Sequence, residues 1–546
     1  MRVSEAVVDG LAGNGIDVVF GIPGKQTLPL NRTIDGREDI QFVVARHETA
    51  VTHQAWGYAE TSGRPAATVT IPGPGDMNAM NGLKNALNDC TPMVHLAVET
   101  APEIRGGDGI HETPPDTYDN VVKDNILVET PESTLADLER AVAAATTPPK
   151  GPVRLGVPKN FLKMDVPLAS PGEYDRKYMD GVPAPEIERA GELLASASTP
   201  VVIAGGGVRA AEASVELQDV ARRLNAPIVT TYKGKGVVPD DNELVAGTLS
   251  GSASQALLDL IEDADAALGV GTDFDAVATR AWSVDVPADL VHVALHAGDL
   301  GAGYDPAVGI VADAAGALAA LSETLAGRDD LPSDGTDRAR RVRQRTAERV
   351  EPLRTGEAPL TSVSVLERLR ETIPREAIVT ADAGGFRVWA LNVFEAYGPR
   401  SYVNPGSWAT MGTGVPSAIG AQVANPDSDV VALTGDGGLL MCLHELHTAA
   451  AEGIPITVVV LNNDDYAIIS EEAERTYHLD EMAYGWSDAS IDFRTVAEGM
   501  GMRAAGATTL DGIDEAVTDA IRADEPALVE IPTDPLEPQA SEWMTD

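Results

Sequence analysis

The sequence predicts an α/β protein built from three doubly wound parallel-sheet domains. Short apolar or β-branched runs alternate with longer helical segments along the chain, which is typical of parallel sheets covered by helices. The chain has 546 residues, and this length is too great for one hydrophobic core. Two polar connectors interrupt the alternation. We therefore expect three sheets, each with its own core.

The two connectors set the expected domain boundaries. The predicted domains cover residues 1–165, 186–328 and 360–534. The first connector, residues 167–185, is rich in Pro, Gly and charged residues, and the second, residues 329–359, runs into an Arg-rich helix. The C-terminal tail from Leu536 is polar, and we expect no regular structure there.

The charge of the chain is strongly negative. There are 84 acidic and 40 basic residues, which gives a formal net charge of −44. Such a surface repels nucleic acid and anionic membranes, so we expect neither as a partner. We interpret the composition as adaptation to a salt-rich cytoplasm of the haloarchaeal type, with a general acidic bias as the alternative.

Cysteine content and hydropathy point to a cytoplasmic protein. Only Cys90 and Cys442 are present, so neither a disulfide framework nor a thiolate metal cluster is expected. The N-terminus resembles an amphipathic helix rather than a signal peptide, and no apolar run reaches the roughly 20 residues that a membrane span requires.

The most informative motif lies between Val430 and Tyr466. A hydrophobic strand ends at a glycine turn that contains Asp436, a helical segment follows over Leu439–Glu452, and a second β-branched strand ends at Asn463. In a right-handed βαβ unit both strand ends open onto one edge of the sheet. Oxygen ligands beside a helix N-terminus suit a Mg²⁺ ion that holds a diphosphate, although an ordinary βα turn is the alternative.

This motif resembles the GDG…NN motif of thiamin diphosphate (ThDP) enzymes. The resemblance implies that Asp436 and Asn463 bind Mg²⁺ through their side chains and Asp465 through its backbone carbonyl. Gly437 and Gly438 would bring amides to the phosphates.

The first domain resembles the pyrimidine-binding domain of the acetolactate synthase and 2-oxo acid decarboxylase family. It carries VVFGIPG at 18–24, ARHETAVTHQAWGYAETSG at 45–63 and TIPGPGDMNAMNG at 70–82, in the order of that family. The resemblance implies that Glu48 donates a hydrogen bond or proton to N1′ of the cofactor pyrimidine, so that the 4′-amino group becomes a base. His47 would face the substrate or cap the N-terminus of the helix. The alternative for His47 and Glu48 together is a solvated helix cap.

A second part of the third domain, SWATMGTGVPSAIGAQ at 407–422, extends the resemblance. There Met411 would support the folded cofactor. The carbonyl of Ala409 would accept a hydrogen bond from the 4′-amino group of the cofactor. Gly384 would lie in a further turn facing the phosphates, with a plain strand-end turn as the alternative. The full set of cofactor-binding residues implied by the resemblance is Gly73, Pro74, Gly75, Asn78, Gly384, Ala409, Met411, Gly435, Gly437, Gly438 and Tyr466.

The resemblance also implies a homodimer or tetramer with active sites at the dimer interface, where Glu48 serves a cofactor held by the partner. The middle domain resembles the FAD-binding domain of acetolactate synthases only weakly. Gly205-Gly206-Gly207 is not a dinucleotide motif, and Asp273 stands where the synthases carry an Arg, so FAD is disfavoured.

The implied reaction is decarboxylation of a 2-oxo acid through a C2 ylide and an enamine, which a carboligation can follow. Lys123 lies in a synthase-like run, but Glu472 replaces the Trp that selects the acceptor in synthases. We expect a decarboxylase in preference to the alternative, an acetolactate synthase catalytic subunit. His111 and Glu112 would reach the substrate from a glycine-rich loop, or lie in a solvated loop. Two alternative functions come from other functional classes: a catalytically silent ThDP-fold binding or regulatory subunit, and a flavin- or nucleotide-dependent oxidoreductase.

Overall fold

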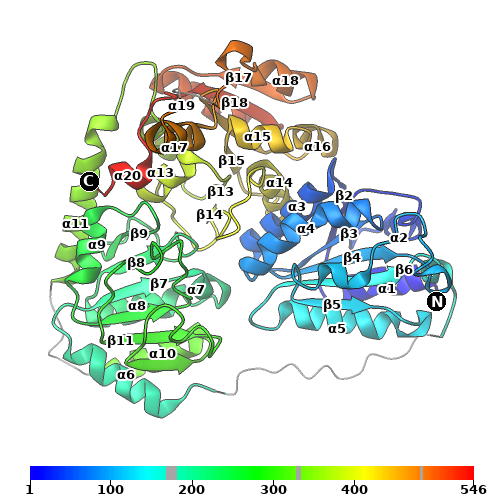
Figure 1. Ribbon diagram of the computed structural model, residues 1–546, viewed down its shortest axis with the longest axis horizontal. Coiled ribbons are helices and arrows are strands. Elements are labelled where there is room, and N and C mark those ends of the chain that lie inside the picture. The colour runs from blue at the N-terminus through cyan, green and yellow to red at the C-terminus, as the bar shows by residue number, and fades with distance from the viewer. Residues whose placement is uncertain (168–180, 327–333, 480–483, 546) are drawn as a thin grey trace.

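The computed structural model describes residues 1–167, 181–326, 334–479 and 484–545. Three α/β lobes are arranged around a common junction (Figure 1). Each contains a six-stranded sheet in which every pair of neighbouring strands is parallel. The predicted fold class, three parallel-sheet α/β domains, is therefore confirmed.

The N-terminal sheet has the strand order β2-β1-β3-β4-β6-β5. Its inner strands β3 and β4 are buried at every position, which explains their continuous apolar and β-branched character. The elements are β1 (Val18–Gly21), β2 (Gln41–Val44), β3 (Ala66–Thr70), β4 (Met93–Glu99), β5 (Asp124–Leu127), β6 (Pro152–Pro158), α1 (Val3–Gly13), α2 (Leu28–Ile34), α3 (Glu48–Ser62), α4 (Pro74–Asn88) and α5 (Thr134–Thr146).

The middle sheet has the strand order β12-β11-β10-β7-β8-β9, with the first βα turn at Gly205. Its core is formed by Val, Leu, Ile and Ala side chains from both faces. The elements are β7 (Val201–Ala204), β8 (Ile228–Thr231), β9 (Val245–Leu249), β10 (Ala267–Val270), β11 (Leu290–Ala294), β12 (Val308–Val311), α6 (Ala184–Ser196), α7 (Gly206–Ala210), α8 (Ser214–Leu224), α9 (Gln255–Glu262) and α10 (Ala314–Leu325).

The C-terminal sheet has the strand order β14-β13-β15-β16-β18-β17, so β13, β15 and β16 are neighbours at its centre. The connecting helix α11 (Gly335–Val350) precedes it. The elements are β13 (Ile378–Ala381), β14 (Tyr402–Val403), β15 (Val430–Gly435), β16 (Thr457–Asn462), β17 (Arg503–Gly506), β18 (Ala527–Pro532), α12 (Ser362–Thr372), α13 (Gly385–Val393), α14 (Gly414–Ala424), α15 (Asp436–Cys442), α16 (Glu445–Glu452), α17 (Ala467–Tyr477), α18 (Phe493–Gly499), α19 (Leu510–Arg522) and α20 (Ala540–Trp543).

The N-terminal and C-terminal domains share one hydrophobic core. α3 lies directly against α14 (Figure 1), and Trp56, Val51 and Ile419 belong to the same buried cluster. The two helices approach closely because glycines face the contact. A β-carbon on Gly420 would lie 1.8 Å from the carbonyl oxygen of Gln54. α3 is therefore held by both domains.

Two local expectations are wrong. The segment Leu439–Glu452 is not one helix: α15 already begins at Asp436 and ends at Cys442, and α16 begins at Glu445. The turn between them contains the i to i−3 hydrogen bond from Leu446 N to Leu443 O, 3.2 Å long. Apolar periodicity does not reveal this turn, because Leu439, Cys442 and Leu446 still face one core.

The C-terminal tail is also more ordered than its polarity suggests. It contains α20, and Ala540 and Met544 are buried. Trp543 packs against α11, where its indole Nε1 donates to the carbonyl of Arg349 at 3.0 Å. Two apolar side chains and one Trp thus anchor the tail. Most of the predicted first connector, residues 168–180, and the start of the second lie outside the described residues.

Among the described residues, no helix combines the length and the apolar character needed to cross a membrane.

Candidate active site

The carboxyl ends of three neighbouring strands bring Asp382 and the predicted residues Asp436 and Asn463 to one edge of the sheet. Asp382 follows β13, Asp436 follows β15, and Asn463 follows β16. The register pairs Gly435 of β15 with Leu461 of β16, so the residues that follow each strand lie at a similar height. This edge is where open α/β sheets bind ligands.

Asp436 is a buried carboxylate with one free oxygen. Its side chain is only 3% exposed, and Oδ1 accepts from the amide of Gly437 at 2.9 Å. Oδ2 is buried and has no hydrogen-bond partner among the described residues. Burial raises the pKa of Asp436 to about 6. A buried carboxylate oxygen without a donor is the arrangement that a cation would satisfy.

The turn after β16 faces Asp436. Oδ1 of Asn463 accepts from the amide of Asp465 at 3.2 Å, and Asp464 has a positive φ of 54°. Asp465 is buried, with Oδ1 bonded to Ser470 and Oδ2 without a partner in the described chain. The described residues contain no cluster of three or more His, Cys, Asp or Glu side chains suited to a metal. One carboxylate, one amide and one carbonyl nevertheless fit a Mg²⁺ whose remaining ligands are diphosphate oxygens.

Gly437, Met411 and Tyr466 meet at the start of α15. A β-carbon on Gly437 would lie 2.6 Å from the ring of Tyr466 and 3.3 Å from Cε of Met411. Met411 is half-buried, and its turn continues into Gly412, which has a positive φ of 82°. Only glycine at position 437 therefore leaves room beside Tyr466 and Met411.

Asp382 organises this half of the site and was not singled out from the sequence. It is fully buried, and its oxygens accept from the amides of Ala383 (2.7 Å) and Gly412 (3.0 Å), and also from the amide and hydroxyl of Thr413 and from Thr434 Oγ1, each at 3.2 Å. Burial raises the pKa of Asp382, while these donors oppose that effect. Asp382 thus ties the Met411 turn to the ends of β13 and β15.

Gly384 and Gly435 border the same edge of the sheet. Gly384 precedes α13, and Gly435 ends β15. A β-carbon on either would lie against the ring of Phe386, at 3.0 Å for Gly384 and 3.7 Å for Gly435. Ala409 has a positive φ of 46°, which turns the chain before Met411.

The N-terminal site residues form a second group. Oε2 of Glu48 accepts from Asn78 Nδ2 at 3.1 Å, and a β-carbon on Gly75 would lie 3.0 Å from Oε1 of Glu48. Glu48 is half-buried at the first residue of α3. His47 is the N-cap of that helix, because its Nδ1 accepts from the amide of Thr49 at 3.2 Å.

The glycine-rich loop lies against the GPG turn. A β-carbon on Gly73 would lie 2.6 Å from the carbonyl oxygen of His111, and Pro74 is exposed beside it. Nδ1 of His111 is buried without a partner in the described chain. Glu112 instead closes its own loop by accepting from the amides of Gly106 and Gly109. Lys123 caps the end of α5, donating to the carbonyls of Ala144 and Thr147 at 2.7 Å each.

The described hydrogen bonds do not join Glu48 to the Asp436 group. Asn81 of α4 contacts the C-terminal domain instead, by donating to Thr410 Oγ1 at 3.1 Å and accepting from Trp408 Nε1 at 2.7 Å. Glu472, on α17, is exposed and bonded to Thr476 and Arg475 of its own helix. Trp486, which the sequence did not suggest, packs edge-on against Tyr466 with ring centroids 5.1 Å apart.

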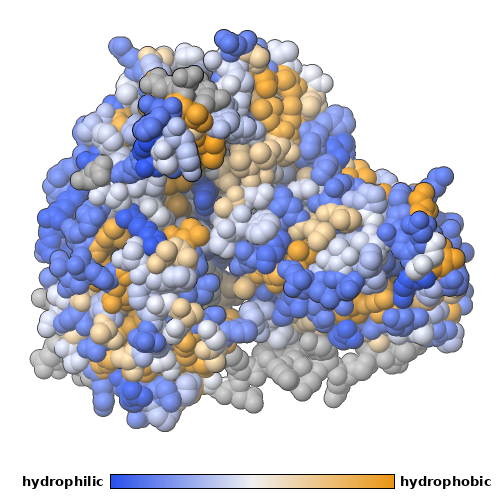
Figure 2. All heavy atoms as spheres, in the orientation of Figure 1, coloured by the Kyte–Doolittle hydropathy of each residue, from blue (hydrophilic) through white to orange (hydrophobic). Residues whose placement is uncertain are grey.

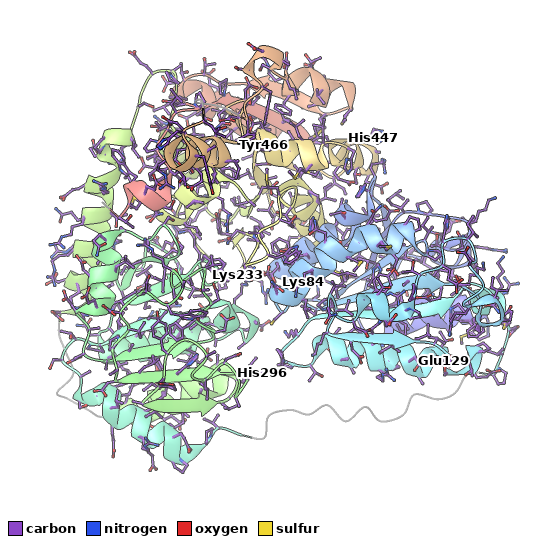
Figure 3. All side chains as sticks on the ribbon, viewed as in Figure 1. Lys84, Glu129, Lys233, His296, His447 and Tyr466 are labelled. Carbon is purple, nitrogen blue, oxygen red and sulfur yellow. The ribbon has the colours of Figure 1, made fainter. Side chains whose placement is uncertain are left out.

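A pocket at the carboxyl edge of the middle sheet lies against the N-terminal domain. Figure 3 places Lys233 and His296, two of its lining residues, on the side of the middle lobe that faces the N-terminal lobe. Lys233 already binds Asp89 at 3.0 Å and Glu60 at 3.3 Å. Arg209 also binds Glu60, so these two cations are paired, while Lys150 and Arg400 line the same pocket.

Carboxylates line the middle-domain pocket beside these cations. Asp273, Asp275 and Asp299 line it, and burial together with Asp275 raises the pKa of Asp273. The glycine turn is closed as well, since the amide of Gly207 donates to the carbonyl of Gly271 at 2.8 Å. A β-carbon on Gly205 would lie 2.2 Å from that carbonyl.

Comparison with known proteins assigns the family. Three family models match the chain: the N-terminal TPP binding domain of thiamine pyrophosphate enzymes over residues 1–120, the central domain over 187–321, and the C-terminal TPP binding domain over 382–531. The acetolactate synthase large subunit of Corynebacterium glutamicum is 30% identical, over 95% of this chain and 84% of that protein. A probable acetolactate synthase large subunit of Methanocaldococcus jannaschii is 28% identical, over 98% of this chain and 93% of that protein. The chain therefore belongs to the thiamine pyrophosphate (ThDP)-dependent enzyme family.

Proposed function

We propose that this ThDP enzyme also requires Mg²⁺ and decarboxylates a 2-oxo acid. The observation that carries the metal assignment is Oδ2 of Asp436, which is buried and has no partner in the described chain. Asp436, the side chain of Asn463 and the carbonyl of Asp465 would hold the ion. The amides of Gly437 and Gly438 at the start of α15 would meet the phosphates, and that of Gly437 also donates to Oδ1 of Asp436.

The remaining residues of the C-terminal group would position the cofactor rings. Bound ThDP supplies a nucleophilic carbon and an electron sink for the loss of CO₂. Met411 would support the rings from below, with Gly435 and Gly384 bordering the phosphate end. Asp382 would hold Met411 in place through the amides of Gly412 and Thr413. Tyr466 would cover Gly437 from the other side.

Glu48 would hold a proton against N1′ of the cofactor pyrimidine, and Asn78 would orient its carboxyl group through their 3.1 Å hydrogen bond. Gly73, Pro74 and Gly75 would let the pyrimidine approach, because a side chain at position 75 would meet Glu48. His111 would face the substrate from the glycine-rich loop with its free Nδ1. His47 would position the start of α3 rather than react.

The proposed outcome is decarboxylation without a fixed acceptor. Glu472 supports this outcome, since it is exposed and engaged with Arg475 and Thr476, and offers no aromatic surface for a second 2-oxo acid. A second candidate is an acetolactate synthase catalytic subunit, because the relatives at 28–30% identity are named as acetolactate synthase large subunits. The two candidates share the steps up to CO₂ loss.

We also propose that two copies build each active site. Exposed apolar side chains surround both groups of site residues: Met77, Ile104 and Ile110 beside the GPG turn, and Met441, Ile468 and Ile469 beside Asp436. Figure 2 shows apolar surface over α15 and next to α17. Exposed apolar surface beside a polar site is typical of an interface. With a net charge of −44, we propose a cytoplasmic enzyme with neither nucleic acid nor membrane as partner.

CO₂ release from a panel of 2-oxo acids, in molar KCl with ThDP and Mg²⁺, tests the proposal. The panel contains pyruvate, 2-oxobutyrate and branched, aromatic and guanidino-substituted acids, with products identified by NMR and Glu48→Gln as the control. Aldehyde from one of the longer acids supports a decarboxylase. Acetolactate from pyruvate supports the second candidate. Release from no acid, despite bound ThDP, contradicts both and points to a silent regulatory subunit.

A further inference from the structure

A buried carboxylate connects the C-terminal domain to the first turn of α3. Glu445, the first residue of α16, is completely buried. Its Oε1 accepts from the backbone amides of Arg46 at 2.9 Å and His47 at 3.1 Å. These two residues immediately precede Glu48. The contact joins positions that lie 399 and 398 residues apart in the sequence.

The second oxygen of Glu445 is also fully engaged. Oε2 accepts from Gln54 Nε2, two turns further along α3, at 3.0 Å, and from Thr448 Oγ1 of its own helix at 2.7 Å. A buried carboxylate without donors would be very unfavourable, and these four donors satisfy it. Three of the four come from the N-terminal domain, so the carboxylate is built to hold that domain.

Glu445 is not bound by a guanidinium or ammonium group in the described chain, and the one ionisable side chain in contact with it is His444, whose Nε2 lies 3.4 Å from Oε1. The guanidinium of Arg46 turns elsewhere, with Nε donating to His447 Nδ1 at 2.9 Å and Nη1 to the carbonyl of Val44. Figure 3 shows His447 at the rim of the C-terminal lobe, above α3. What Glu445 binds is the peptide backbone of the two residues before Glu48. That backbone sets where the Glu48 side chain leaves the helix.

We propose that Glu445 is a positioning residue for Glu48, which rests on the proposed role of Glu48 as the acid at the cofactor pyrimidine. By holding the amides of Arg46 and His47, Glu445 fixes the direction of the first turn of α3 and therefore the place of the Glu48 carboxyl group. The same side chain follows Asp436 by nine positions on the paired helices α15 and α16. One segment of the C-terminal domain thus carries both the proposed metal ligand and the support for the proposed acid.

The neighbourhood of Glu445 offers matched variants. Glu445→Gln keeps an oxygen for the two amides. Its new NH₂ group can donate to Gln54, whose Oε1 is buried without a partner in the described chain, once the Gln54 amide turns over. Glu445→Leu has a similar size but leaves both backbone amides without an acceptor. Thr448→Val removes only the donor from α16 and serves as the control.

Two independent measurements test the proposal on the full-length protein. Hydrogen exchange followed by mass spectrometry reports on the amides of residues 46 and 47 without cofactor. We expect Glu445→Leu to accelerate their exchange about tenfold or more, whereas Glu445→Gln and Thr448→Val stay close to wild type. With ThDP and Mg²⁺, we expect Glu445→Leu to lower kcat about 10²-fold, the usual scale of an acid–base contribution, with ThDP affinity changed less than threefold.

Unchanged exchange at residues 46 and 47 in Glu445→Leu, or a loss of ThDP affinity as large as the loss of kcat, would overturn the proposal. A loss of activity in Glu445→Gln equal to that in Glu445→Leu would overturn it too. If Glu445→Leu does not fold, Glu445→Asp, which is one methylene shorter, carries the same expectation. If wild type turns over no 2-oxo acid, the proposed function fails, while the exchange measurement still tests whether Glu445 holds α3.

Discussion

Gly57 of α3 and Ser417 of α14 are in backbone contact, and a β-carbon on Gly57 would lie 2.2 Å from the carbonyl oxygen of Ser417. This contact brings the N-terminal and C-terminal domains into a single core. It also fixes α3, which carries Glu48 at its first residue. The position of the proposed acid therefore depends on packing that lies far from the site.

Gly57→Ala is expected to destabilise the protein by about 1–3 kcal/mol, because the added methyl group forces the two helices apart. Chemical denaturation in high salt measures the change. Gly13→Ala in α1 is the control, since nothing lies within 4 Å of its added β-carbon. Equal stability of Gly57→Ala and wild type would mean that the two helices are not packed this closely.

Asp436→Asn is expected to stabilise the cofactor-free protein above pH 6. Burial raises the pKa of Asp436 to about 6. The contribution of this carboxyl group to the free energy of unfolding is therefore most favourable below about pH 4, and it is lost as the pH rises through about 6. At pH 8 the buried charge costs up to about 3 kcal/mol, which Asn avoids. Thermal unfolding at pH 5 and pH 8 measures the difference.

The same variant tests the metal. Mg²⁺ with ThDP is expected to raise the Tm of wild type but not of Asp436→Asn, because the amide is a weaker ligand than the carboxylate. For wild type, this stabilisation should weaken as the pH falls below 6 and Asp436 takes up a proton. An equal shift in both proteins would exclude Asp436 as a metal ligand.

α19 offers a local test of the acidic surface. Asp511, Glu515 and Asp519 are exposed at i, i+4 and i+8 along this helix, where like charges repel. Glu515→Lys turns two repulsive pairs into attractive ones and is expected to add about 0.5–1 kcal/mol of stability at low salt. The gain should vanish in 2 M KCl, where charges are screened within a few ångströms. A gain that persists there would show that charge repulsion is not its cause.

FAD is expected neither to copurify with the protein nor to stabilise it. Lys233 and Arg209 of the middle-domain pocket are paired with Glu60 and Asp89, and Asp273 lines the same pocket. Visible absorption of the purified protein and the Tm with added FAD check this. The Tm with ThDP and Mg²⁺ is the positive control. Flavin absorption at one equivalent would show that the pocket accepts the diphosphate despite these carboxylates.

Features that depend on neighbouring residues could be predicted from the sequence. The three parallel sheets follow from local alternation, and Asp436 and Asn463 meet because each directly follows a strand of one βαβ unit. For the middle sheet the sequence predicts strands over residues 201–203, 228–230 and 266–270, so β9, β11 and β12 were not predicted. β9 contains a glycine with an irregular register, and β12 is only half-buried, so neither shows a clear apolar run.

Features that depend on distant residues could not be predicted. Asp382 looks like an ordinary strand-end residue until the turn at Gly412 folds over it. Glu445 looks like one of many acidic helix residues, and only the packing of α3 against α14 makes it a buried acceptor. Glu112 and Lys123 were candidates by resemblance, yet each makes a local structural contact. Glu112 closes its own loop, and Lys123 caps the C-terminal end of α5.

The central claim is that Glu48 and Asp436 serve one active site across a dimer, and mixing two inactive variants tests it most directly. Glu48→Gln and Asp436→Ala are each expected to lack 2-oxo acid turnover. After they are unfolded and refolded together, the mixed dimer would contain one intact site, with Glu48 from one copy and Asp436 from the other. Random mixing makes about half of the dimers mixed, so we predict about one quarter of wild-type activity. No recovery, with dimers formed and ThDP bound, would contradict the account.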